Sequence, residues 1–452
     1  MLKKISFFIL LTISALTINA QIIDNNYKQN QPKENSLLSR YGLGNLNPQY
    51  FASNAGMGGM TAAYRDKYHL NPFNPASLPA LRTTAYEVGL YAKSTDVKSS
   101  GGNSSAWSGN LNNLALGFPT YSVINEVLDR KPRAVRWGMA MSLMPYSTVG
   151  YNINTVTPAQ NSLDSSTLTN YFVGSGGTYR GMLGNGISYK GFSFGVNVGY
   201  VFGKINSIRQ SILGDKLSVS YANYFDDDYN IRGFSWNGGL QYDFTLDPKK
   251  NPNDQGDRKH IVIGLYGNPS TSFTTKSNRY YNRVLGTLVD SVTSFTDKAG
   301  SGVLPSEYSA GIMYENGLLF KGGIEYKASK WSQYKNDAKP ETLLDANQFS
   351  AGAEFILDKN KLKSEEEKVR YRVGFHTGSD PRSLGGEQVK NTAGTIGMCL
   401  PLRVGRGQQI SYMNLGLEYG QLKTKIITEN YFRINRGFTL NDNTWFLKRK
   451  FQ

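Results

Sequence analysis

The sequence predicts an all-β fold, a transmembrane antiparallel β-barrel of about 14 strands with an N-terminal hatch, or plug, segment in its lumen. Three observations predict it: an export signal, a composition rich in aromatic residues and glycine, and a repeated alternation of apolar and polar residues. Residues 1–20 contain two lysines, a short apolar run and a small residue, Ala20, before Gln21. This pattern is typical of a signal peptide, since a spanning helix needs roughly 20 apolar residues.

The composition favours a barrel over soluble domains. The chain has 29 Tyr, 22 Phe and 48 Gly, yet its mean hydropathy is negative. Strands that face lipid on one side and a polar lumen on the other produce this average. The single cysteine, Cys399, excludes an internal disulfide framework, and its alternation with Met398 and Leu400 places it on the inward face.

The net charge indicates anionic neighbours. It is +16 for the whole chain, and removing Lys3 and Lys4 with the signal peptide leaves +14. Because the chain is expected to be exported, we predict outer-membrane lipids, including lipopolysaccharide, as its charged partners and no nucleic acid.

The chain divides into three expected segments: a signal peptide at 1–20, a hatch at 21–81 and a barrel at 82–452. Between Gln21 and Arg82 the sequence has no sustained alternation. From Arg82 onward, alternating segments of about ten residues recur with turn signals between them, as tilted strands in an outer membrane require.

The clearest hairpin turns at Lys190-Gly191, where glycine accepts the positive φ of a two-residue turn. After it, large apolar side chains alternate with small or polar ones. The first set is expected to face lipid and the second the lumen. The lipid-facing set is Phe192, Phe194, Val196, Val198, Tyr200 and Phe202; the lumen set is Ser193, Gly195, Asn197, Gly199 and Gly203.

Fourteen such segments can be counted, and an even number fits a bacterial barrel. They lie near 82–97, 107–118, 134–146, 168–189, 192–209, 230–246, 259–273, 304–315, 318–328, 347–358, 368–378, 390–404, 408–422 and 430–440.

Connection lengths predict the orientation. Periplasmic turns are usually short and extracellular loops long. This rule places both termini in the periplasm of a multi-pass outer-membrane protein. It makes 147–164, 212–229 and 274–301 long extracellular loops.

The last strand contains an exception to the apolar pattern. Arg436 interrupts the face formed by Phe432, Ile434, Phe438 and Leu440. A charge at the lipid midplane costs roughly 2 to 4 kcal/mol, so a bulge, a partner protein or a different register must account for it.

The sequence offers little for catalysis. His69, His260 and His376 have no neighbour at metal-ligand spacing and no serine motif. The run 226–228 is Asp-Asp-Asp and could bind Ca²⁺, but it lacks the spacing of an EF-hand, and a solvated acidic loop is the preferred interpretation. We predict no enzyme activity, no cofactor and no metal.

The hatch is the most informative segment for function. Its apolar and flexible residues could form a greasy site in the lumen, because methionine adapts to varied shapes. The alternative, given equal weight, is a plug that only seals and stabilises the pore. The candidate binding residues are Met57, Met60, Phe73, Asn74, Pro75, Ala76 and Leu78.

Several short stretches of the chain are distinctive: 39–44, 56–64, Asn74-Pro75-Ala76, Leu304-Pro305 to Gly311, 330–334, 430–432 and Trp445-Phe446. Together they resemble the FadL/TodX family of outer-membrane transporters for hydrophobic compounds, most closely its branch in Bacteroidota. The resemblance implies a fourteen-stranded barrel, an N-terminal hatch and passive diffusion of fatty acids or aromatic hydrocarbons.

Two functions are therefore expected. The first is a channel for hydrophobic small molecules, with Arg82, Arg180 and Arg372 as candidate contacts to a solute carboxylate or, equally, members of lumen salt bridges. The alternative is a non-transporting accessory subunit of an outer-membrane protein secretion or assembly complex, which would contact other outer-membrane proteins. Such a role predicts a lipid-facing surface with interrupted alternation, and Arg436 points that way.

Overall fold

The computed structural model describes residues 34, 36–99, 101–121, 124, 126, 133–158, 167–214, 222–247, 259–285, 287–317, 319–358, 364–403 and 410–443. Residues 1–31 form a separate unit from 32–452. The expected signal peptide, the expected turn at 405–407 and the pair Trp445-Phe446 lie outside the described residues.

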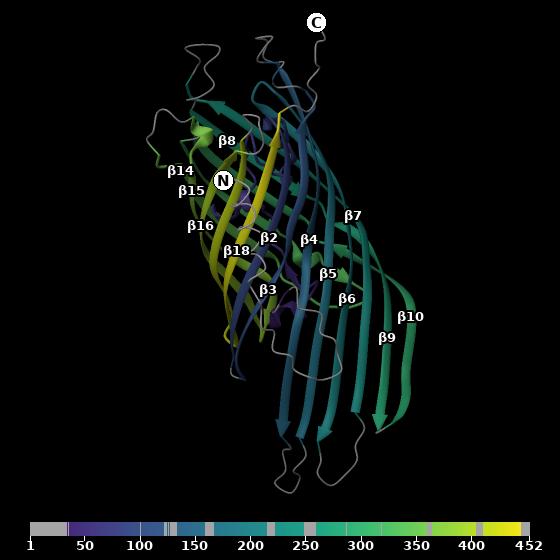
Figure 1. The fold of residues 1–452 in the computed structure, drawn as a ribbon. Helices are drawn as coiled ribbons and strands as arrows, with labels where there is room; N and C mark the ends of the chain where they lie inside the picture. The colour runs from purple at the N-terminus through teal and green to yellow at the C-terminus, as the bar shows by residue number, and fades with distance from the viewer. Residues whose placement is uncertain are drawn as a thin grey trace, which may run out of the picture. The chain divides into compact units, whose positions relative to one another are not determined.

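Antiparallel strands follow one another around a single sheet that closes on itself (Figure 1). The closing pair is β18 with β2, joined from Ile427↔Ser99 to Asp442↔Thr84. The strands are β1 (Asn45–Leu46), β2 (Thr84–Ser99), β3 (Gly102–Pro119), β4 (Val135–Pro158), β5 (Thr167–Tyr189), β6 (Phe192–Gly214), β7 (Ala222–Thr245), β8 (Lys259–Asn268), β9 (Thr271–Leu285), β10 (Leu288–Leu304), β11 (Glu307–Asn316), β12 (Phe320–Ser329), β13 (Lys335–Asn336), β14 (Ala346–Ile356), β15 (Arg370–Leu384), β16 (Glu387–Arg403), β17 (Ile410–Lys423) and β18 (Ile427–Asp442).

The barrel wall has fourteen strands, which confirms the predicted fold class. β8 continues into β9 and β10 into β11, so each of these pairs counts as one wall strand, and the two-residue strands β1 and β13 lie outside the count. Both continuous strands break at a Pro-Ser pair, 269–270 and 305–306, because proline cannot donate to the ladder.

Side chains alternate between lipid and lumen as the sequence predicts. On β6, Phe194 is 50% exposed and Val198 56% exposed on the outer face, whereas Ser193 and Asn197 are buried on the inner face. The β5–β6 turn has φ of 47° at Lys190 and 85° at Gly191, the left-handed values that a tight hairpin needs. Cys399 is buried on the inner face, as expected.

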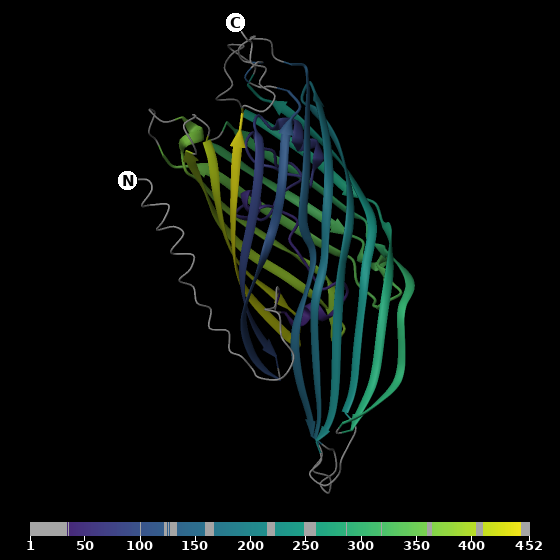
Figure 2. The same cartoon turned by 45° about the vertical axis from the view of Figure 1, so that its right-hand side comes forward.

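The three stretches expected to be long loops are largely strand. β4, β5, β6, β7, β9 and β10 run well past the other strands as one sheet, drawn at the bottom of Figure 2. Residues 274–301 form most of the β9–β10 hairpin, and the acidic run 226–228 lies within β7. The sequence-based prediction missed this extension because both of its faces carry polar residues. Its strands therefore show no alternation of apolar and polar residues in the sequence.

We call the end where β2 begins and β18 ends the terminal end, and the opposite end, with the extension, the distal end. The N-terminal segment, described for residues 34 and 36–81, has little regular structure and lies against the inner faces of the wall strands. Its helix η1 (Leu37–Arg40) contacts β4, and α2 (Ala52–Ala55) contacts β16, β17 and β18. Its helix η2 (Pro75–Ala80) contacts β3 to β7. None of the helices in the described part of the chain is long and apolar enough to span a membrane.

Candidate functional site

The N-terminal segment packs against the wall through glycine. Inward-facing glycines lie on eleven of the fourteen wall strands at the places where this segment touches them. A Cβ added to any of them would come within 3.0 Å of the segment. The contacts form a belt, which we call the glycine belt: Gly117, Gly138, Gly186, Gly195, Gly239, Gly264, Gly352, Gly374, Gly397, Gly416 and Gly437.

The contacts of the belt are mostly to backbone. A Cβ on Gly264 would lie 1.9 Å from the Ala62 carbonyl oxygen, and one on Gly374 would lie 2.2 Å from the Gly58 nitrogen. At seven of the eleven glycines the nearest atom of the segment is a main-chain atom, so main chain lies directly on main chain at these places. Protein interiors are close-packed and hold few voids, so we expect little empty space where the segment contacts the belt.

The residues predicted to form a greasy pocket are packed in this region. Met57, Met60, Phe73, Asn74, Pro75, Ala76 and Leu78 are all buried. Four of them belong to two hydrophobic clusters: Met57 and Met60 pack with Tyr64, Val262 and Met313, while Phe73 and Leu78 pack with Phe51, Leu70 and Met182. None of the seven is among the residues that line the cavity described below. Their role in ligand binding stays a prediction.

Asn74 holds the segment in place. Its Nδ2 donates to the Ala62 carbonyl at 2.6 Å, and its Oδ1 accepts from the Ala76 nitrogen at 3.1 Å, which caps η2. Pro75 follows at the first position of η2, where a proline needs no backbone donor. The Asn-Pro-Ala triplet thus has a structural role.

A buried charge network joins the segment to the wall near the terminal end. Asp66 accepts from Lys321 Nζ at 3.0 Å and from Arg370 Nη1 at 3.2 Å. Glu354 accepts from Arg372 Nε at 2.6 Å and lies 3.5 Å from Arg370 Nη1. All five side chains are buried, and such pairs persist only when their charges compensate one another.

The three arginines proposed as carboxylate contacts each have a protein partner. Arg372 also donates to Asn414 Oδ1 at 2.7 Å. Arg82 lies 3.4 Å from Glu126, and Arg180 donates to Gln49 while its guanidinium lies over the Tyr146 ring. Their contact with a solute carboxylate stays a prediction.

The structure brings together three residues that sequence analysis did not connect. Cys399 Sγ lies 3.8 Å from His69 Nε2, and His69 Nδ1 lies 3.2 Å from Asp66 Oδ1. This order resembles a nucleophile, base and carboxylate. All three are buried, and none lines a described cavity. The trio links the N-terminal segment to β16.

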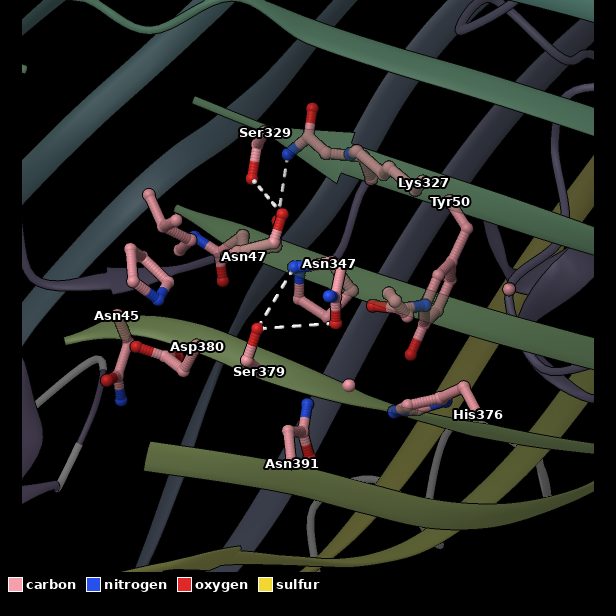
Figure 3. Close-up of a pocket in the computed structure, with 18 of the residues that line it drawn as sticks. Asn45, Asn47, Tyr50, Lys327, Ser329, Asn347, His376, Ser379, Asp380 and Asn391 are labelled. Atoms are coloured by element: carbon pink, nitrogen blue, oxygen red, sulfur yellow. Dashed lines mark hydrogen bonds between the residues drawn. The ribbon is translucent and has the colours of Figure 1, made fainter. Parts of the chain in front are cut away.

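A cavity of about 210 Å³, lined about equally by polar and apolar atoms, lies on the distal side of the belt (Figure 3). Residues 45–50 of the N-terminal segment form one side of it. Side chains from β12, β14, β15 and β16 form the other, including Lys327, Asn347, His376 and Asn391.

Several charged pairs lie on the cavity lining. Lys93 donates to Glu34 at 3.0 Å, Arg382 Nε to Asp380 at 2.6 Å, and Lys327 lies 3.4 Å from Glu307. Glu325 accepts from the Thr61 and Ala62 nitrogens at 2.5 and 2.6 Å, and Glu418 accepts from the Tyr50 and Tyr431 hydroxyls. Glu325 and Glu418 therefore join the N-terminal segment to the wall by hydrogen bonds on this side of the belt as well.

Two buried polar atoms on the lining have no protein partner in the described part of the chain: His376 Nδ1 and Asn45 Nδ2. Buried polar groups normally bond to protein or water. These two atoms therefore leave hydrogen-bonding positions open to water or a small polar solute.

Sequence analysis missed the glycine belt and the charge network. A signal was present for the belt, because glycine recurs at inward positions such as Gly195, Gly264 and Gly374. The partners on the N-terminal segment could not be found from sequence, because they lie between 47 positions (Gly117 to Leu70) and 385 positions (Gly437 to Ala52) away.

The closed fourteen-stranded wall and the N-terminal segment inside it define an outer-membrane β-barrel of the FadL-like fold. The model of the BamG family matches residues 1–452, and the chain therefore belongs to the BamG family.

The fold is similar to solved barrels at low sequence identity. A FadL homologue of Pseudomonas aeruginosa has a TM-score of 0.55 and 9% identity, over 88% of this chain and 99% of its own. The toluene transporter TodX of Pseudomonas putida has 0.52 and 15%, over 87% and 99%. The monoaromatic hydrocarbon channel CymD has 0.50 and 16%, over 89% and 98%. No curated protein matches the sequence significantly.

Proposed function

We propose that this protein is a non-transporting accessory subunit of an outer-membrane protein assembly complex, the Bam complex to which the family's name points. The observation that carries the proposal is the packing of the N-terminal segment, which lies largely backbone to backbone on the glycine belt. A passive channel for bulky apolar solutes needs a continuous apolar route, and the packed segment fills the place where it would run.

The chemistry of the lumen supports the same conclusion. Sites for small organic ligands are usually apolar clefts of roughly 300–1,000 Å³. The cavity here is about 210 Å³, and its lining, although partly apolar, includes the carboxylates of Glu34, Glu307, Glu325, Asp380 and Glu418. Burying an alkyl chain among these groups would remove their hydration without replacing it.

Uptake of hydrophobic compounds remains the second candidate. The observation that favours it is the fold likeness to TodX and CymD, whose names state a transport or channel function. At this level of identity the likeness concerns the fold alone. The hatch residues Met57, Met60 and Phe73 would have to separate from the wall before a solute could pass.

In the orientation that we propose, the distal extension projects from the bilayer. We place the distal end outside the cell and both termini in the periplasm. The extension then stands above the bilayer as a six-stranded wall. Its outer face changes from Phe202 and Phe234 to Lys204 and Arg232 along β6 and β7, which marks the edge of the lipid region.

Affinity purification of the tagged chain from native membranes in a mild detergent tests the proposal. We expect stoichiometric recovery of other outer-membrane proteins, including the central assembly barrel, and no hydrophobic compound in the lumen by native mass spectrometry. A FadL-type barrel of the same host, tagged in the same way, is the control. A lone barrel carrying a fatty acid or an aromatic hydrocarbon would contradict the proposal.

A transport assay separates the two candidates directly. Liposomes containing the purified chain should take up a fluorescent fatty acid or toluene no faster than protein-free liposomes, whereas TodX should accelerate uptake. If the chain accelerates uptake and the Phe73→Asp variant abolishes that acceleration, the hatch-pocket hypothesis is correct.

A further inference from the structure

The lipid-facing surface carries one charge at mid-depth in the described part of the wall. Arg436 is exposed on the outer face of β18, with Ile434 and Phe438 on either side along the strand. Its cross-strand neighbours are Leu415 on β17 and Leu90 on β2. The register of β18 is continuous on both sides, so neither a bulge nor a shift turns this side chain inward.

This chain supplies no counter-ion for Arg436 among the described residues. Its recorded contacts are Nη2 to the Met413 sulfur at 3.6 Å and the guanidinium over the Phe438 ring at 5.0 Å. Both contacts are weak beside a carboxylate pair. The guanidinium therefore keeps most of its hydrogen-bonding capacity unused on a surface without water.

Arg436 lies too deep to reach lipid headgroups. The apolar outer positions of β18 run from Phe432 to Leu440, a length of about 26 Å along the strand. With the usual tilt of about 40°, this covers roughly 20 Å of the membrane normal, and Arg436 is at its centre. Either edge is about 10 Å away, farther than an extended arginine side chain reaches.

The rest of the outer surface shows that this position is unusual. The only other outward polar side chain at comparable depth that we find on the described strands, Asn185, accepts from the Trp137 indole at 3.2 Å. Outward charges such as Lys204 and Arg232 lie beyond the apolar band.

We infer that the face formed by β17, β18 and β2 around Arg436 docks against another integral outer-membrane protein that presents a carboxylate at mid-bilayer depth. A carboxylate supplies the bidentate partner that a guanidinium fits, and a membrane protein is the occupant able to hold one at that depth. Leu90, Leu415 and Phe438 surround the pair and exclude water from it. This inference rests on the proposed function and names the face through which the subunit binds.

Replacing Arg436 tests the docking face. In purification from native membranes, Arg436→Leu should reduce recovery of the partner by about tenfold or more, because it removes one member of a desolvated charge pair. Arg436→Lys should restore part of the recovery. Arg232→Leu, which removes an exposed outward arginine beyond the apolar band, should leave recovery unchanged.

A second readout keeps a folding defect from being mistaken for lost docking. The isolated Arg436→Leu barrel should unfold at the same or a higher temperature than the wild type, since it no longer exposes a charge to lipid or detergent. A lower unfolding temperature would mean that Arg436 stabilises its own barrel, and the docking inference would be wrong.

Crosslinking locates the face. A photo-reactive amino acid at Leu90 or Leu415 should crosslink to one membrane protein, and the same group at Val198 on β6 should react with lipid only. Equal protein crosslinks at all three positions, or full recovery with Arg436→Leu, overturn the docking face while the proposed function stands. If the wild-type chain recovers no partner at all, the proposed function fails and the docking face with it.

Discussion

Gly56 of the N-terminal segment lies against Gly397 of β16 so closely that a Cβ on Gly397 would be 2.9 Å from the Gly56 Cα. A Cβ on Gly56 would be 2.7 Å from the Gly397 Cα. Contacts of this kind leave the segment no room to slide along the wall.

Substitutions in the glycine belt should destabilise the protein. Gly264→Ala would place a Cβ 1.9 Å from the Ala62 carbonyl, and the required shift should cost about 1–3 kcal/mol, as overpacking does. Urea unfolding of the reconstituted barrel measures this. Gly394→Ala is the matched control, because nothing lies within 4 Å of its Cβ. Equal effects of the two variants would show that the belt does not hold the segment.

The buried charge network should be sensitive to loss of a single member. Glu354→Gln leaves Arg370 and Arg372 short of compensating charge, and we expect a loss of about 3–5 kcal/mol in the free energy of unfolding. Asp227→Asn on the extension removes an exposed partner of Arg279, and exposed pairs contribute about 0–1 kcal/mol. A Glu354→Gln variant as stable as Asp227→Asn would contradict the assignment.

The loop between β12 and β14 should loosen in acid. The Lys330 ammonium and the Ser332 hydroxyl and amide lower the pKa of Asp345 to about 2. The unfolded pKa is about 3.9, so the ionised carboxylate stabilises the loop above that pH, and this contribution is lost as the pH falls through 2.

Hydrogen-exchange protection of residues 330–345, corrected for intrinsic rates, measures this change. Protection should decrease between about pH 4 and pH 2 in the wild type. In Asp345→Asn it should be low throughout. A wild-type profile that stays flat over this range rules the assignment out.

The tip of the β9–β10 hairpin should be dispensable for folding. Replacing residues 276–299 by Asn-Gly keeps the pair Thr275↔Gly300 and the buried Phe273 and Leu304. Because most of the removed residues are exposed and β7 still pairs with β6, the variant should remain heat-modifiable on gels with an unchanged unfolding midpoint. Failure to form a heat-modifiable barrel would show that the extension takes part in closure.

The sequence by itself determined the wall. Alternation is local, with a period of two residues, so the outer face of β6, the tight turn at Lys190-Gly191 and the number of wall strands could all be predicted from it. The deviation at Arg436 was visible for the same reason.

Tertiary structure alone decided what the lumen contains and how far the wall extends. The approach of Cys399 to His69 and of Gly264 to Ala62 depends on contacts between residues more than 200 positions apart, which no local pattern encodes. The β9–β10 hairpin escaped prediction because neither of its faces is buried in a core. Strand pairing through backbone hydrogen bonds needs no particular side chain, so such a segment carries no periodic signal.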